Sequence, residues 1–93
     1  MKILHLPLKK KWFDMIYSGE KPEEYREIKP YWDGRLFKHQ FTHIKFRNGY
    51  SSKDPSFIIE LKGISKGMPN PKWCEDANRP VYVLKLGVVV EEK

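Results

Sequence analysis

The residues of this chain best suited to chemistry are a lysine, a glutamate and an arginine that follow a glycine at fixed spacing. Residues 19–26 read Gly-Glu-Lys-Pro-Glu-Glu-Tyr-Arg, which is the pattern G-x-K-x-x-E-x-R. If residues 23–28 are extended, Glu24 and Arg26 point to the same side of the strand, and Lys21 lies where the strand begins. A lysine, a carboxylate and a guanidinium gathered in this way can hold a phosphate or a planar polar ligand. The alternative is a solvated ionic patch that contributes little energetically.

A helix must precede this cluster and end just before it. Apolar residues recur at three- and four-residue steps from Leu8 to Tyr17, which predicts one amphipathic helix near the N-terminus. Gly19 can adopt a positive φ just past the last turn and so ends the helix. Pro22 prevents the helix from resuming and biases Lys21 towards an extended conformation.

Short runs of apolar and alternating residues predict strands along the rest of the chain. Residues 29–36, with Pro30 and Asp33-Gly34, read as a turn or a short helical loop. We therefore expect an α+β fold that is mainly β, a small mixed β-barrel of about five or six strands with one N-terminal amphipathic helix. Besides 23–28, the predicted strands are residues 2–6, 41–46, 56–64 and 81–90, the last of them broken at Gly87.

Length and composition limit the function classes. A chain of 93 residues is expected to form a single domain, residues 1–93, with one core. A net charge of +6 favours a polyanionic partner, nucleic acid first. No apolar stretch approaches the ~20 residues that span a membrane, and residues 1–8 are too short for a secretory signal. With a single cysteine, Cys74, and three scattered histidines, we expect a cytoplasmic protein with no disulfide, metal site or cofactor.

The cluster and its continuation resemble the ASCH domain family, and most closely the small single-domain ASCH proteins of phages and prophages. The resemblance covers nearly the whole chain, and its most specific parts are residues 19–26 and the following Glu27-Ile28-Lys29-Pro30-Tyr31-Trp32. It implies a PUA-like fold with a cleft beside the N-terminal helix, and a link to RNA binding. Further segments that agree are Phe46-Arg47-Asn48-Gly49-Tyr50, Leu61-Lys62-Gly63-Ile64, Asn70-Pro71-Lys72-Trp73 and Val83-Leu84-Lys85-Leu86-Gly87.

The first hypothesis is a binding module whose basic cleft accepts RNA or a nucleotide. Arginine and lysine would meet phosphate, the glutamate would accept from a base, and loop aromatics would stack on bases. A monomer is the favoured oligomeric state. The predicted ligand-binding residues are Lys21, Glu24, Arg26, Arg47, Asn48, Tyr50 and Trp73.

Two other hypotheses come from different classes. Some ASCH relatives are amidohydrolases of acetylated cytidine nucleosides and others are associated with RNA cleavage, which would make Lys21 and Glu24 catalytic. In the amidohydrolases a threonine taken to be the nucleophile stands at the position of Glu24, so this chain departs from that pattern. Their downstream acidic partner has no clear match, and Glu60 is a candidate only because it lies on a predicted strand. The third hypothesis is a phage-type accessory protein that binds a protein partner.

Overall fold

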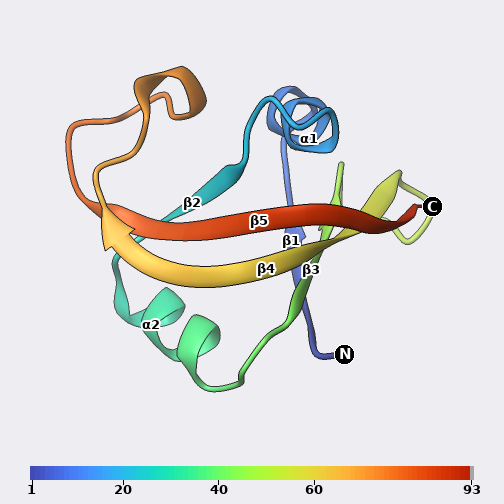
Figure 1. Ribbon diagram of the computed structural model, residues 1–93, viewed down its shortest axis with the longest axis horizontal. Coiled ribbons are helices and arrows are strands. Elements are labelled where there is room, and N and C mark those ends of the chain that lie inside the picture. The colour runs from blue at the N-terminus through green and yellow to red at the C-terminus, as the bar shows by residue number, and fades with distance from the viewer. Residues whose placement is uncertain (93) are drawn as a thin grey trace.

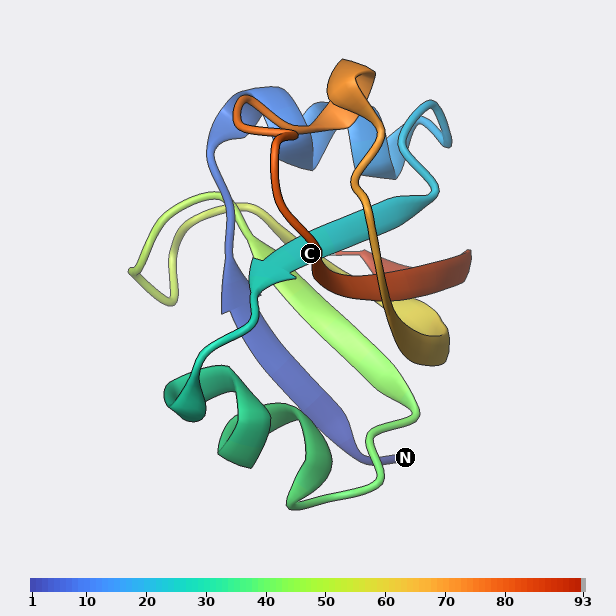
Figure 2. The same cartoon turned by 90° about the vertical axis from the view of Figure 1, so that its left-hand side faces the viewer.

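Five strands form one strongly curved sheet, a curled half-barrel with two helices (Figures 1 and 2). The computed structural model describes residues 1–92. The expectation of an α+β fold that is mainly β is confirmed. The elements follow one another as β1 (Ile3–Pro7), α1 (Lys10–Tyr17), β2 (Glu23–Glu27), α2 (Pro30–Phe37), β3 (His43–Arg47), β4 (Ser56–Gly67), a 3₁₀ helix (Pro71–Trp73) and β5 (Val81–Glu92).

The sheet order is β1-β3-β4-β5-β2, so neighbours in space are mostly not neighbours in sequence. β1 and β3 run parallel, and the other neighbouring strands are antiparallel. β4 and β5 are long and bend together across the molecule (Figure 1). Register shifts between Ile58 and Gly63 let these two strands curve. Curvature brings β2, at one edge, towards β1 at the other.

Alternate side chains of the strands point to one core. Leu4 and Leu6 of β1 and Ile44 and Phe46 of β3 are almost completely buried, as the alternation in these runs predicts. α1 and α2 lie at opposite ends of the curved sheet in both views (Figures 1 and 2). The core is completed by a buried side chain from each helix, Ile16 of α1 and Leu36 of α2.

The expectation of a single helix is wrong, because residues 30–37 form the eight-residue α2. Pro30 occupies the first turn, where its missing N–H is not needed, and Asp33 adds a favourable negative charge there. The Asp33-Gly34 pair suggested a turn from local chemistry. Burial of Leu36 and a hydrogen bond from the Tyr82 hydroxyl to Asp33 stabilise the helix instead.

The predicted break at Gly87 is an irregularity of the pairing and not an end of the strand. β5 continues through it to Glu92, but Ile59 pairs with Val89 and Leu61 with Leu86, so the register with β4 shifts opposite Gly87. A Cβ built on Gly87 would lie 2.4 Å from Oε1 of Glu60, so only glycine leaves room for that side chain. Oε1 of Glu60 accepts a hydrogen bond of 3.1 Å from the Val88 backbone N–H. The glycine therefore admits a cross-strand carboxylate and does not end the strand.

Two arginine side chains donate hydrogen bonds to backbone carbonyls at the free edge of β1. Nη2 of Arg26, on β2, donates to the carbonyl of Pro7 at 3.2 Å. Nη2 of Arg35, on α2, donates to the carbonyl of His5, also at 3.2 Å. These side chains satisfy edge carbonyls that a closed barrel would pair with another strand.

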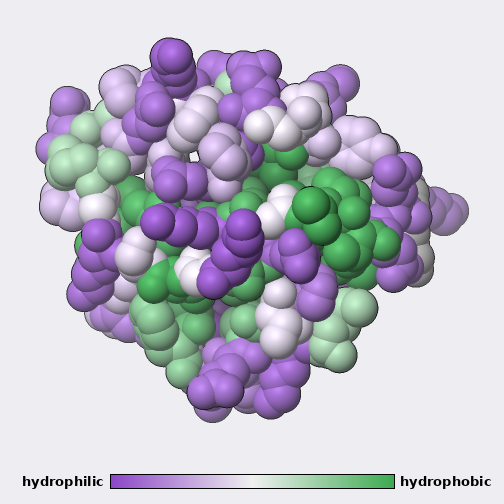
Figure 3. All heavy atoms as spheres, in the orientation of Figure 1, coloured by the Kyte–Doolittle hydropathy of each residue, from purple (hydrophilic) through white to green (hydrophobic). Residues whose placement is uncertain are grey.

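The face of the molecule seen in Figure 3 is mostly polar, with a small apolar patch near the C-terminal end of β5. Val88 and Val90 are exposed there. None of the helices among residues 1–92 is long and apolar enough to cross a membrane.

Candidate functional site

A cleft of about 240 Å³ lies beside the start of α1 and brings together four of the predicted residues. Lys21, Glu24 and Arg26 line it from the α1–β2 turn and from β2, and Trp73 lines it from the 3₁₀ helix. The 3₁₀ helix and its flanking loops lie next to α1 in the second view (Figure 2). The remaining lining residues are Pro7, Leu8, Lys9, Trp12, Tyr25, Cys74 and Glu75.

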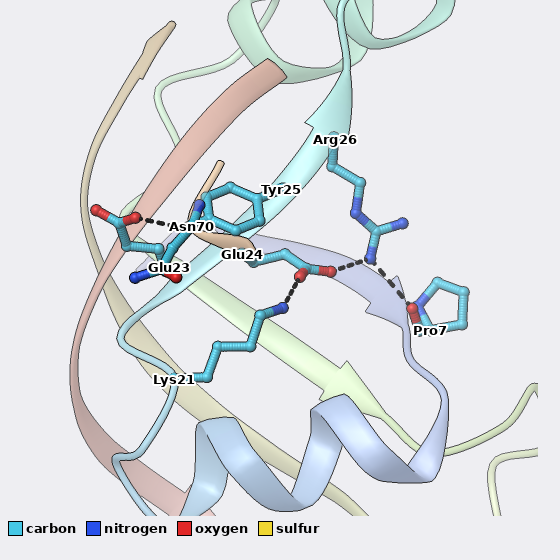
Figure 4. A network of polar contacts seen from close by, with 7 residues as sticks. All are labelled: Pro7, Lys21, Glu23, Glu24, Tyr25, Arg26 and Asn70. Atoms are coloured by element: carbon cyan, nitrogen blue, oxygen red, sulfur yellow. Dashed lines mark hydrogen bonds and ion pairs between the residues drawn. The ribbon is translucent and has the colours of Figure 1, made fainter. Parts of the chain in front are cut away.

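Lys21, Glu24 and Arg26 form a continuous ionic cluster, shown in Figure 4. Nζ of Lys21 donates to Oε1 of Glu24 at 2.6 Å, and Nη2 of Arg26 donates to Oε2 of the same carboxylate at 2.7 Å. The side chains of Lys21, Glu24 and Arg26 are 2%, 6% and 17% exposed. Lys21 and Glu24 are therefore buried and Arg26 is half-buried, and the interpretation as a solvated ionic patch is wrong.

Local backbone structure fixes the position of Lys21. Gly19 adopts a φ of +88°, the left-handed conformation that ends α1. The Lys21 backbone N–H then donates to the Met15 carbonyl at 2.9 Å, and the Pro22 carbonyl accepts from the Leu86 N–H at 3.0 Å. The lysine is held between the last turn of α1 and the middle of β5.

Strand pairing fixes the other two members. β2 pairs antiparallel with β5, so that Glu24 lies opposite Leu84 and Arg26 opposite Tyr82. Because side chains two residues apart share a face of a strand, Glu24 and Arg26 lie side by side. The alternation in the sequence predicts this placement.

Aromatic rings surround both cations. Nζ of Lys21 is 4.7 Å from the ring centroid of Trp12 and 5.5 Å from that of Tyr25. Cζ of Arg26 is 5.2 Å from the ring centroid of Trp32, on α2. Such cation–π contacts partly replace the water that the buried charges have lost.

The cluster has more hydrogen-bond donors than acceptors. An ammonium group has three N–H donors, and within residues 1–92 Glu24 is the one hydrogen-bond acceptor for that of Lys21. Nε of Arg26 is buried and has no hydrogen-bond partner in the same range. Two cations share one carboxylate, so the cleft has a surplus positive charge and unsatisfied donors. An oxygen-rich anion such as a phosphate would satisfy both.

Tyr25 ties the chain segment after β4 to the cleft. Its hydroxyl accepts a hydrogen bond of 3.1 Å from the Asn70 backbone N–H and donates to Oε1 of Glu23 at 2.8 Å (Figure 4). Burial of the phenol, opposed by the Asn70 hydrogen bond and reinforced by that to Glu23, raises the pKa of Tyr25 to about 12. The contact holds Trp73 and its neighbours beside the cleft.

This shift predicts a loss of stability in alkali. The folded-state pKa of Tyr25 lies above the ordinary tyrosine value of 10.0, so the stabilisation is complete below pH 10 and is lost as the pH rises towards about 12. We expect Tyr25→Phe to lose less stability than the wild type across this window, in urea unfolding measured at successive pH values. The pKa values of Tyr17 and Tyr82 are also raised by hydrogen bonds to carboxylates. Both residues remain in both proteins, so their contributions to the pH dependence of stability cancel in the comparison. Equal losses in the two proteins would contradict the prediction.

Several lining residues were not predicted from the sequence. Lys9 and Glu75 form an ion pair of 3.4 Å, and both side chains are largely exposed. Cys74 lies between Trp73 and Glu75, and its thiol donates to the Asp76 carbonyl. Cys74 and Glu75 directly follow the predicted Trp73, so proximity to that residue was the one available signal.

Three predicted residues lie elsewhere. Arg47 and Tyr50 line a separate hollow of about 160 Å³, which shares Pro7 with the cleft. The Asn48 backbone N–H donates to the Pro55 carbonyl within the β3–β4 loop. The structure does not bring these three residues to the cluster.

Glu60, considered as a catalytic acid, is also remote from the cluster. It is engaged with the Val88 N–H on β5 and does not line the cleft. The acid that lines the cleft after β4 is Glu75.

Comparison with known proteins identified no matching family model, no matching curated protein and no matching solved structure.

Proposed function

We propose that this protein binds single-stranded RNA or a nucleotide in the cleft, as an ASCH-type module with a PUA-like fold. The observation that carries the proposal is the buried cluster in which Lys21 and Arg26 share the single carboxylate of Glu24. Buried ion pairs are poor sources of stability, since apolar residues of similar size are often as stable or more so. Buried, strongly interacting charges in a cleft are instead typical of functional sites.

The chemistry of the cleft favours a nucleotide over a simple anion. The surplus donors of Lys21 and Arg26 suit phosphate or base carbonyl oxygens. Trp12, Tyr25 and Trp73 line the same cleft, and aromatic rings of this kind stack on unpaired bases in RNA-binding proteins. Both carboxylate oxygens of Glu24 are occupied, so its role is to hold the two cations in place.

Binding is favoured over hydrolysis by the groups that line the cleft. Oε1 and Oε2 of Glu24 each accept a hydrogen bond from a cation, so both oxygens of that carboxylate are already engaged. No serine or threonine is among the described residues that line the cleft. The hydroxyl attack implied for the acetylcytidine amidohydrolases therefore has no counterpart at Glu24.

A salt titration tests the proposed function. With about four phosphate contacts at about −0.7 each, the logarithm of affinity for a single-stranded RNA of about ten nucleotides should fall against the logarithm of salt concentration with a slope near −3. The measurement is fluorescence anisotropy of the labelled RNA at several salt concentrations. An absence of binding at low salt, or an affinity that does not change with salt, would contradict the proposal.

A further inference from the structure

A second basic surface lies next to the cleft, and the proposed function does not use it. We call it the β1–β3 face and define it by five cationic or titratable side chains and one aromatic. Neighbouring pairs in the register of the two strands are His5 with Lys45 and Pro7 with Arg47. The face consists of His5, Arg35, Lys45, Arg47 and Lys53, with the aromatic Tyr50.

The cations of this face have no carboxylate partners. No ion pair within residues 1–92 involves Arg35, Lys45, Arg47 or Lys53. The two arginines donate to backbone carbonyls, Arg35 to that of His5 and Arg47 to that of Ser51. These hydrogen bonds orient the guanidinium groups without neutralising them.

Asp54 is the one acid among the described residues that line the hollows of this face. Its Oδ2 accepts from the Ser51 backbone N–H at 2.9 Å, which braces the β3–β4 loop. A Cβ built on Gly49, whose φ is +126°, would lie 2.1 Å from the same oxygen. Asp54 is thus packed against the loop, and the face keeps a net positive charge.

The positive charges of this face act on the pKa of His5. It is lowered by burial first, and then by the charges of Lys45 and Arg47 from β3 and Arg35 from α2. The imidazole is therefore harder to protonate than that of a free histidine. A polyanion on this face would relieve the repulsion among these groups.

The hollows of the face continue the cleft. The cleft and the first hollow, of about 160 Å³, share Pro7. A second hollow, of about 450 Å³, shares Lys45 and Arg47 with the first. Tyr50 stands 91% exposed at the first hollow, where a ring can stack on a base without competing for space in the core.

We propose that the ligand is a single-stranded RNA chain, which places one nucleotide in the cleft and runs across Pro7 onto the β1–β3 face. This inference rests on the proposed function. The cleft volume, about 240 Å³, is below the range of about 300–1,000 Å³ that is usual for small-molecule sites, so it suits one end or one nucleotide of a longer ligand. Spaced, unpaired cations match the repeating charge of a phosphodiester chain.

The test compares ligand length and the charges of the face. Fluorescence anisotropy would measure affinity for a single-stranded RNA of about ten nucleotides, and competition would measure the four nucleoside 5′-monophosphates. The variant is Lys45→Ala/Lys53→Ala, because neither side chain takes part in an ion pair within residues 1–92. The control, Lys62→Ala/Lys85→Ala, removes the same charge from exposed positions on β4 and β5 outside these hollows.

The expected result is a length-dependent loss. At physiological ionic strength the variant should lose about tenfold in affinity for the RNA, its salt slope should become shallower by about 1.4, and its affinity for monophosphates should not change. The control should lose about threefold at most. Equal RNA affinities of the variant and the control, or tighter binding of a duplex than of the single strand, would overturn the inference.

A histidine titration gives an independent readout and separates the two proposals. The NMR-measured pKa of His5 should rise when the RNA is bound, because phosphates offset Lys45, Arg47 and Arg35. Unchanged titration of His5 with bound RNA, while monophosphates still bind, would overturn the β1–β3 path and leave the cleft intact. Failure of both the RNA and the monophosphates to bind would overturn the proposed function and the path together.

Discussion

Glu24→Ala is expected to lower the free energy of unfolding by about 3–5 kcal/mol, the usual cost of removing one partner from a buried ion pair. The substitution leaves the buried Lys21 and the half-buried Arg26 as neighbouring cations with no carboxylate between them. The rings of Trp12 and Trp32 contact these cations, but they supply neither a full negative charge nor the strong hydrogen-bond acceptor that the carboxylate provided. Urea unfolding followed by tryptophan fluorescence measures the change.

Asp14→Ala provides the matched control for this loss. Asp14 also accepts from a lysine at 2.6 Å, but that pair with Lys10 is on the exposed side of α1. Removing it should change the free energy of unfolding by no more than about 0.5 kcal/mol. If Glu24→Ala lowers the free energy of unfolding by no more than Asp14→Ala does, the cluster is not the buried charged unit described above.

Lys21→Met is expected to weaken the binding of nucleoside 5′-monophosphates at least tenfold, and up to about a hundredfold. Loss of one charge-assisted contact in a desolvated cleft is worth about 1.5–3 kcal/mol of affinity. Methionine keeps an unbranched side chain of similar length, so the packing under Trp12 is largely preserved. Glu24 keeps its hydrogen bond from Arg26 at 2.7 Å, so the carboxylate stays paired.

The control is Lys11→Met, because Lys11 also lies over the Trp12 ring, at 4.5 Å. Its side chain is exposed and does not line the cleft. Isothermal titration of the two variants with the same monophosphate should separate them. Equal affinities would show that Lys21 does not contact the ligand.

The cluster could be predicted from the sequence because its geometry is local. The stop at Gly19, the block at Pro22 and the alternation from Glu23 place three charges within six residues. Burial of the cluster was not visible, since it depends on Trp12 and on the segment around Trp73 closing over β2. Charge and spacing say nothing about which distant residues cover a strand.

The arrangement of the distant residues could not be predicted, because it follows from the sheet order. Arg47 ends β3 and Tyr50 lies in the β3–β4 loop, and β3 lies beside β1, at the opposite side of the sheet from β2. Periodicity gives the faces of strands but not their order. Pro7 lines both regions, since it pairs with Arg47 on one side and its carbonyl accepts from Arg26 on the other.

Two glycine positions show the limit of local patterns. Asp33-Gly34 and Gly87 both carry turn chemistry, yet one lies in α2 and the other inside β5. In each case a side chain distant in sequence contacts the position, Tyr82 in the helix and Glu60 in the strand. Tertiary contacts override weak local preferences at such positions.

The most direct measurement pairs unfolding with binding in one variant, Lys21→Met/Glu24→Leu/Arg26→Met. If the cluster serves ligand binding and not stability, replacing it with apolar side chains should leave the free energy of unfolding within about 1 kcal/mol of the wild type or raise it. The same protein should lose at least about a hundredfold in affinity for the single-stranded RNA and for the monophosphates, since both cations of the cleft floor are gone. A folded triple variant that binds these ligands as tightly as the wild type would contradict the assignment of the cleft as the binding site.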